Sequence, residues 1–150
     1  MSDDYEKYEI ECKRIREANK RLLEEFAVYL QQSGLSGKTI DKHTENIEFY
    51  INEFLLYEET QEPQEGVCRV GRFLGYWFIK KAMWSSASSI KSNAASLKRF
   101  YTYLHEREMV SQADLDSLKR EIRANMPEWL ARLARYDDPS ITELEEIWEW

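Results

Sequence analysis

The sequence predicts an all-α protein, because apolar residues recur at helical spacing along most of the chain and helix-breaking residues are scarce. The 150 residues include five glycines and three prolines, which leaves little material for the turns of a sheet-rich fold. Hydrophobic residues make up 43% of the chain and charged residues 33%, a balance typical of a folded globular protein. We therefore expect helices packed around one apolar core.

The first helix is predicted over residues 5–32, where apolar residues recur at steps of three and four and Gly34 follows the end. Its first half is highly charged, which favours a separate or frayed piece as an alternative to one long helix. Ser36 has the character of an N-cap and opens a second helix. The apolar stripe of this second helix consists of Ile40, His43, Ile47, Tyr50 or Ile51, and Phe54.

Residues 59–66, ETQEPQEG, lack periodicity and are predicted to form the main loop. A third helix is expected over residues 67–83, where the run FLGYWFIKKAMW is apolar on nearly all sides. Such a segment is predicted to lie centrally in the core. Four aromatic residues in this helix and directly after it could instead form a platform that stacks nucleic-acid bases, although their apolar neighbours favour core packing. These four are Tyr76, Trp77, Phe78 and Trp84.

Serines between residues 85 and 89 supply several candidate N-caps for a fourth helix that runs to about Arg107. Ser111 and Asp114 resemble a capping box and predict a fifth helix. Pro127 is expected to start a sixth, because proline is favoured in the first helical turn. A last short helix is predicted from Ser140 or Thr142 onward. Residues 141–150, ITELEEIWEW, are expected to fold back onto the bundle, with docking on a partner as the alternative.

Several classes of protein are not indicated by the sequence. Cys12 and Cys68 lie far apart and outside any metal or redox spacing, so we expect reduced thiols. The acidic N-terminus lacks an apolar signal region, and no run approaches the roughly 18 apolar residues that a membrane span needs. No phosphate-binding loop, dinucleotide motif or zinc motif occurs. We expect a cytoplasmic protein without a cofactor, a metal, a small-molecule ligand or a membrane partner.

The net charge of −7 argues against an indiscriminate binder of polyanions. The distribution of charge is more informative than the sum. Residues 36–110 hold ten basic and ten acidic side chains, whereas residues 111–150 hold five basic and ten acidic ones. The central part of the chain is therefore neutral, and the excess of acid lies toward the ends.

Two segments of this neutral part carry a resemblance to a known family. Residues 34–55, GLSGKTIDKHTENIEFYINEFL, open with Gly-Leu-Ser before a helix that has an aromatic and apolar stripe. Residues 88–104, SSIKSNAASLKRFYTYL, begin with serines and lead into a leucine and a Phe-Tyr pair. With the helix between them, they resemble the N-terminal, SAM-like core-binding domain of tyrosine recombinases and phage integrases over residues 20–110. Residues 1–19 and 111–150 are then helical extensions.

The resemblance implies a four-helix bundle that grips duplex DNA with the starts of its second and fourth helices. Helix N-termini and hydroxyl groups bind phosphate oxygens, and lysines neutralise phosphate charge. Ordinary helix capping and a solvated surface would use the same residue types, and this alternative stays open. The residues that match the family are Ser36, Lys38, Thr39 and Lys42 in the first segment and Ser88, Ser89, Lys91, Ser92 and Lys98 in the second.

Catalysis in this family uses an Arg, a His-x-x-Arg pair and a Tyr nucleophile on a second domain. Neither histidine here supplies that pair, because Asn46 follows His43 at the third position and Glu108 follows His105. We therefore expect a non-catalytic DNA-binding module, acting alone or with a recombinase chain. The alternative is a protein-interaction adaptor on the same bundle. It is favoured by Thr44, Glu45 and Ser92, which stand where the family often has basic residues.

Overall fold

The prediction of an all-α protein is confirmed. The computed structural model describes residues 2–82 and 85–137, and within these ranges it contains helices and no strand. The α-helices are α1 (Ser2–Gln32), α2 (Gly37–Phe49), α3 (Val70–Arg72), α4 (Phe78–Lys81), α5 (Ala87–Glu106) and α6 (Gln112–Asp137). Two π-helical turns, η1 (Tyr50–Phe54) and η3 (Phe73–Trp77), and one 3-10 helix, η2 (Pro63–Cys68), complete the set.

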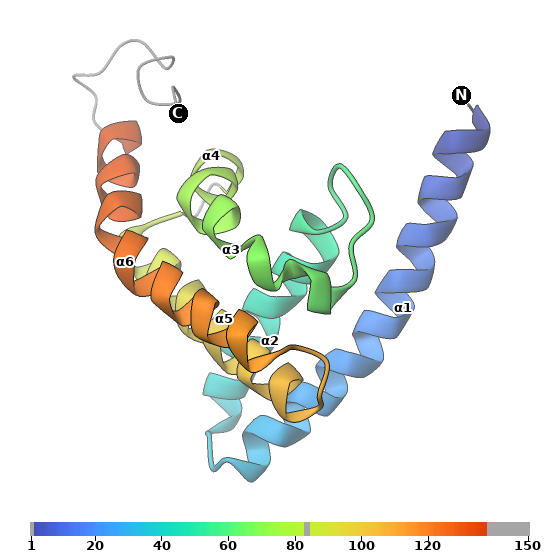
Figure 1. The fold of residues 1–150 in the computed structure, drawn as a ribbon, viewed down its shortest axis with the longest axis horizontal. Helices are drawn as coiled ribbons and strands as arrows, with labels where there is room; N and C mark the ends of the chain where they lie inside the picture. The colour runs from blue at the N-terminus through green and yellow to red at the C-terminus, as the bar shows by residue number, and fades with distance from the viewer. Residues whose placement is uncertain (1, 83–84, 138–150) are drawn as a thin grey trace.

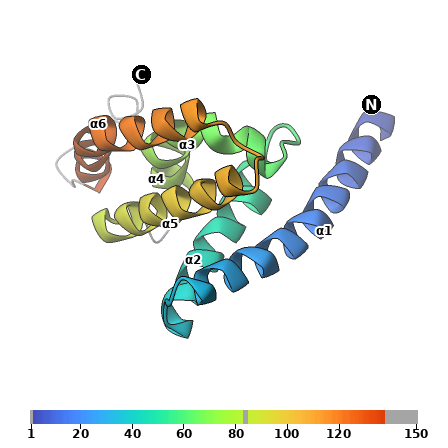
Figure 2. The ribbon, with the colours of Figure 1, turned by 60° about the horizontal axis from the view of Figure 1, so that its bottom comes forward.

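The helices pack as a bundle from which one end of α1 projects. The second half of α1 packs on α2, and α2 crosses α5 (Figure 1). α6 lies along α5 and also contacts the run from η2 to η3. The N-terminal half of α1 extends away from the body of the molecule in both ribbon views (Figures 1 and 2). The protein therefore has a compact body and a helical arm.

One hydrophobic cluster forms the core and draws on every major helix. Phe26 of α1, Phe73 of η3 and Phe100 of α5 are fully buried in it. α6 contributes residues on both halves, including Leu118 and Trp129. The predicted C-terminal extension thus shares the core of the bundle over its described part, and the predicted boundary between residues 19 and 20 falls inside α1.

The helix boundaries follow the capping signals of the sequence. Ser36 Oγ accepts a hydrogen bond from the Thr39 backbone N–H at 3.3 Å, and Ser86 forms a capping box with Ser89 at the start of α5. Ser111 Oγ accepts from the Asp114 backbone N–H at 3.1 Å. Gly34, with φ of 87°, adopts the left-handed conformation that ends α1 at little steric expense.

The predicted loop at residues 59–66 is only partly correct, because its second half forms the 3-10 helix η2. Pro63 occupies the start of this helix, where proline fits, and Glu62 and Glu65 cap it reciprocally. Two buried tyrosines then fix the turn from the core side. Tyr101 donates a hydrogen bond to the Pro63 carbonyl at 2.7 Å, and Tyr50 donates to the Gly66 carbonyl at 2.6 Å.

The prediction that Pro127 starts a sixth helix is wrong, since α6 runs without interruption from Gln112 to Asp137. Proline removes one hydrogen bond from a helix interior and normally disfavours continuation. Here, apolar residues on both sides of Pro127 pack into the same core, which holds the helix together. Trp129 fits so closely over Gly75 that a Cβ at residue 75 would lie 2.4 Å from the indole nitrogen.

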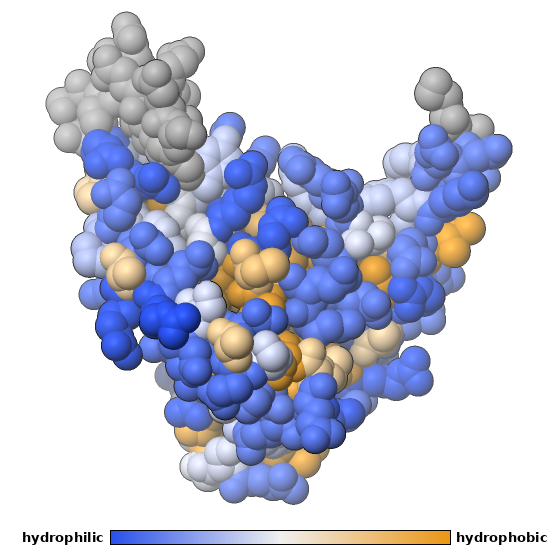
Figure 3. Space-filling model, viewed as in Figure 1, coloured by the Kyte–Doolittle hydropathy of each residue, from blue (hydrophilic) through white to orange (hydrophobic). Residues whose placement is uncertain are grey.

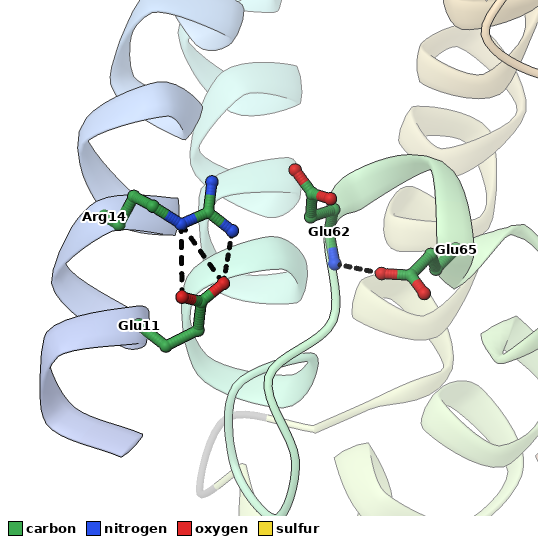
Figure 4. A network of polar contacts seen from close by, with 4 residues as sticks. All are labelled: Glu11, Arg14, Glu62 and Glu65. Carbon is green, nitrogen blue, oxygen red and sulfur yellow. Dashed lines mark hydrogen bonds and ion pairs between the residues drawn. The ribbon is translucent and has the colours of Figure 1, made fainter. Parts of the chain in front are cut away.

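The charged first half of α1 is neither separate nor frayed in the structure. Cys12 and Ile15 form a small buried cluster with Leu56, and Tyr8 donates a hydrogen bond to the Leu56 carbonyl. An ion pair joins Arg14 to Glu11 on the surface beside the Glu62–Glu65 cap (Figure 4). The Arg14 hydrogen bond lowers the pKa of the Glu11 carboxyl. The Cys12–Ile15–Leu56 cluster and the Tyr8 hydrogen bond keep the base of the arm attached to the body.

Three sequence predictions concern residues outside those that the structure describes. They are the last short helix, the packing of residues 141–150 and the position of Trp84. Within the described part, α1 and the other helices are all too polar or too short to cross a membrane. Both cysteines are free, Cys12 being buried and Cys68 exposed.

Candidate nucleic-acid interface

A polar seam joins α2 and α5 where the two helices cross. We define it as His43, Asn46, Ser92 and Ser96. Asn46 Nδ2 donates to Ser92 Oγ at 3.1 Å and to Ser96 Oγ at 2.9 Å. His43 Nδ1 lies 2.7 Å from Ser96 Oγ. The seam is a set of polar contacts at the edge of an otherwise apolar core.

The order of these contacts shows how the two helices run. The later α2 residue, Asn46, meets the earlier α5 residue, Ser92, so the helices are antiparallel at the crossing. The starts of α2 and α5 therefore lie toward opposite ends of the crossing. The structure does not bring the two predicted groups of hydroxyls and lysines together as one cluster.

The predicted site residues divide into structural and exposed groups. Ser36 and Thr39 hydrogen-bond each other at the start of α2, Ser89 takes part in the α5 capping box, and Ser92 belongs to the polar seam. Capping thus accounts for three of the hydroxyls and helix packing for the fourth. Five exposed side chains have no such role, namely Lys38 and Lys42 on α2 and Ser88, Lys91 and Lys98 on α5, and the capping residues Ser36 and Thr39 are exposed as well.

The exposed face of α5 is basic between residues 91 and 99, and the exposed Glu106 ends the helix. Lys91, Lys98 and Arg99 are exposed, and the exposed residue between them, Ala95, has only a short side chain. Residues 87–105 contain no aspartate or glutamate, although the chain as a whole has a net charge of −7. We call the surface formed by Lys91, Ala95, Lys98 and Arg99 the α5 basic face.

The exposed face of α2 differs, because acidic and basic residues alternate along it. Asp41, Glu45 and Glu48 are exposed on the same helix as Lys38 and Lys42. Carboxylates near the lysines weaken the local positive potential. α5 is therefore the stronger candidate for an anionic partner, and α2 contributes at most its first turn.

Arg99 is the residue of this surface that the family resemblance did not select. Its signal was present in the sequence, since it directly follows Lys98 in a segment without carboxylates. Arg99 also lies near enough to His43 to affect its pKa. The α5 basic face thus borders the polar seam.

His43 is a packed, hydrogen-bonded histidine and not an exposed phosphate ligand. Burial, with a smaller contribution from the nearby Arg99 charge, lowers the pKa of His43 below 6.5. The Ser96 hydroxyl lies 2.7 Å from His43 Nδ1, 3.1 Å from the Ser92 carbonyl and 2.9 Å from Asn46 Nδ2. These contacts hold the imidazole ring against α5.

The lowered pKa of His43 predicts a pH dependence of stability. Because the folded-state pKa is below the unfolded value of 6.5, the unfolded chain takes up the proton first as the pH falls. The contribution of neutral His43 to the free energy of unfolding is complete above pH 6.5 and is lost as the pH falls through the folded-state pKa. Urea unfolding should show that wild type loses more stability between about pH 7.5 and pH 5.5 than His43→Gln. Parallel losses in the two proteins would contradict the lowered pKa of His43.

The aromatic residues of the third helical segment are divided between core and surface. Phe78 is fully buried, which agrees with core packing, whereas Tyr76 and Trp77 are partly exposed and line a hollow. Tyr50 and Tyr101 are buried hydrogen-bond donors, and burial raises the pKa of each hydroxyl well above 10.0. They hold η2 in place and are not available as nucleophiles.

The described residues include no cluster of three or more His, Cys, Asp or Glu side chains that could hold a metal ion. Comparison with known proteins finds no matching family model, no matching curated protein and no matching solved structure. The resemblance to recombinase core-binding domains therefore stays a prediction from the two helical segments. The α5 basic face and its surroundings are the features from which a function can be inferred.

Proposed function

We propose that this chain is a duplex DNA-binding module of the recombinase core-binding type, and that the α5 basic face is its contact surface. The observation that carries the proposal is the presence of three exposed cations on a helix segment without carboxylates, in an acidic protein. Net charge alone would oppose binding, but DNA responds to the local potential within about 10 Å at moderate salt.

Phosphate contacts supply most of the affinity of such an interface. Lys91 and Lys98 are seven residues apart, or about two helical turns and about 10 Å along the axis. Ala95 lies between them and leaves room for the DNA backbone, and Ser88, about one turn before Lys91, offers an exposed hydroxyl donor. Cations at this spacing can neutralise phosphates on one DNA strand and release bound counterions. On this proposal, Lys38 adds a further contact from the start of α2.

A double variant tests whether both helices take part. Lys38→Ala with Lys91→Ala should weaken binding to two duplexes of unrelated sequence by the same factor, because phosphate contacts carry no sequence information. It should also reduce the slope of log affinity against log salt by about 2. Fluorescence anisotropy of labelled duplexes measures both quantities. Lys7→Ala with Lys119→Ala is the matched control, since both of these lysines are exposed but lie on α1 and α6.

Unchanged affinity in the Lys38/Lys91 variant, or an equal loss in the control, would remove this surface from the proposal. A loss confined to one of the two duplexes would instead indicate contacts with base edges.

The alternative function is a protein-interaction adaptor, and the arm of α1 favours it. Tyr5 and Ile10 are 62% and 69% exposed on this arm. In Figure 3 the visible surface is mostly hydrophilic, but apolar patches remain near the centre and on the projecting arm. An exposed apolar helix end is a common docking element for another protein. Two results together would support the adaptor: the unaltered protein does not bind DNA, and the Ile10→Asp variant no longer binds a protein partner that the unaltered protein binds.

A further inference from the structure

A hollow of about 260 Å³ lies beside the third helical segment, between the end of η1 and the η3–α4 run. Typical ligand pockets have volumes of roughly 300 to 1,000 Å³. The hollow is therefore large enough for one small planar group and too small for an extended cofactor. Its walls combine cations with aromatic rings.

Four cations line the hollow, and two of them converge on one ring. The guanidinium carbon of Arg72 lies 5.3 Å from the centre of the Tyr76 ring, and Lys80 Nζ lies 5.7 Å from it. The other two cations are Arg69 and Lys81. Glu58 and Glu59 also line the hollow, which leaves an excess of two positive charges among these groups. The hollow thus attracts an anion in a chain that is acidic overall.

An aromatic side chain at the edge of the hollow is exposed to solvent. Tyr57 is 51% exposed, although its ring packs against Trp77 with centroids 5.7 Å apart. Lys81 Nζ lies 5.5 Å from the Tyr57 centroid. An exposed aromatic ring beside cations is suited to stacking a base while the cations bind its phosphate.

The backbone around the hollow is also irregular. The π-helical turns η1 and η3 end at Phe54 and Trp77, and both of these residues line the hollow. Such turns are rare and occur frequently at functional sites. The Trp77 indole N–H is shielded from water and has no hydrogen-bond partner among the described residues. A buried donor without an acceptor is uncommon in a folded protein.

We infer that this hollow binds a single nucleotide unit, with the base against Tyr57 and Trp77 and the phosphate between Arg72 and Lys80. The nucleotide is either free or part of a single strand, because both sources offer the same base and phosphate. This inference goes beyond the proposed function, since it concerns different residues from the α5 basic face and does not require a duplex.

The first test is an NMR titration of the ¹⁵N-labelled full chain with thymidine 5′-monophosphate, thymidine and inorganic phosphate. Saturable shifts for residues 55–61 and 69–81 are expected with the nucleotide, and much weaker shifts with either part alone. No shifts in these residues with the nucleotide would overturn the inference. Equal shifts with inorganic phosphate would reduce the hollow to a simple anion site and also overturn it. A parallel titration with oligothymidine shows whether the ligand is a free nucleotide or part of a single strand. Tighter binding of the oligomer than of the mononucleotide indicates a single strand.

Matched variants separate this site from the duplex surface. Tyr57→Ala should weaken nucleotide binding by at least about 5-fold, because stacking on the ring is lost. Tyr5→Ala, which removes another well-exposed tyrosine from the α1 arm, should leave nucleotide binding unchanged. Lys80→Ala with Lys81→Ala should weaken binding of the nucleotide more than that of thymidine, whereas Lys13→Ala with Lys20→Ala should have no effect. Equal behaviour of Tyr57→Ala and Tyr5→Ala would contradict the stacking role.

The two proposals fail independently in these experiments. Substitutions on the α5 basic face should leave nucleotide shifts in the hollow intact, and Tyr57→Ala should leave duplex affinity intact. Loss of both activities in either variant would indicate one continuous surface and contradict the existence of two separate sites.

Discussion

Reversing the three charges of the α5 basic face, by Lys91→Glu, Lys98→Glu and Arg99→Glu, is expected to weaken duplex binding by at least about 100-fold. The substitutions remove three phosphate contacts and place three carboxylates against the DNA backbone. All three side chains are exposed, so the bundle should still fold. Anisotropy at low salt measures the loss, and circular dichroism checks the fold.

The control for this variant carries the same change of charge on another helix. The control is the triple variant Lys119→Glu, Arg120→Glu and Arg123→Glu, whose wild-type side chains are exposed on α6. Like the α5 variant, it makes the net charge of −7 more negative by six. If only overall charge mattered, both variants would lose affinity equally. Equal losses would therefore contradict the assignment to α5, whereas a much larger loss in the α5 variant supports it.

The second large effect concerns stability. Phe26→Ala should lower the free energy of unfolding by about 3 to 5 kcal/mol, because a fully buried ring is removed and a cavity remains. The Phe26 ring meets Phe100 edge-on at 5.3 Å and Tyr103 at 5.7 Å, so it joins α1 to α5. Urea unfolding followed by circular dichroism measures the change.

Val28→Ala is the matched control on the same helix, since Val28 is 51% exposed. It should change the unfolding free energy by less than about 0.5 kcal/mol. A loss below about 1 kcal/mol in Phe26→Ala would mean that α1 does not depend on this contact with the bundle.

Local signals in the sequence were sufficient to predict much of the fold. The N-caps Ser36 and Ser111 and the terminal Gly34 lie where capping rules place them, because these interactions involve residues close in sequence. The continuity of α6 through Pro127 could not be predicted in this way. It depends on how Trp129 packs over Gly75, more than 50 residues away in sequence. The π-helical turns likewise leave no clear sequence signal.

The candidate site was predicted less completely. Position matching selected Ser92, which proves to belong to the polar seam, and passed over Arg99 beside Lys98. The hollow was not predicted, because the apolar run of residues 73–79 indicated a helix buried on all sides. One side of this helical segment is in fact basic and aromatic. Arg69, Arg72, Tyr76 and Lys80 recur at steps of three and four and so share one helical side. The loop residue Tyr57 joins them only through the tertiary fold.

Salt dependence of duplex binding by the unaltered protein tests the central claim most directly. If Lys38, Lys91, Lys98 and Arg99 each neutralise one phosphate, log affinity should fall against log salt with a slope of about −3.6. Anisotropy between roughly 50 and 200 mM salt should then show affinity falling by about 150-fold. Absence of binding at the lower salt concentration, or binding that does not change with salt, would contradict the DNA-binding account and favour the adaptor.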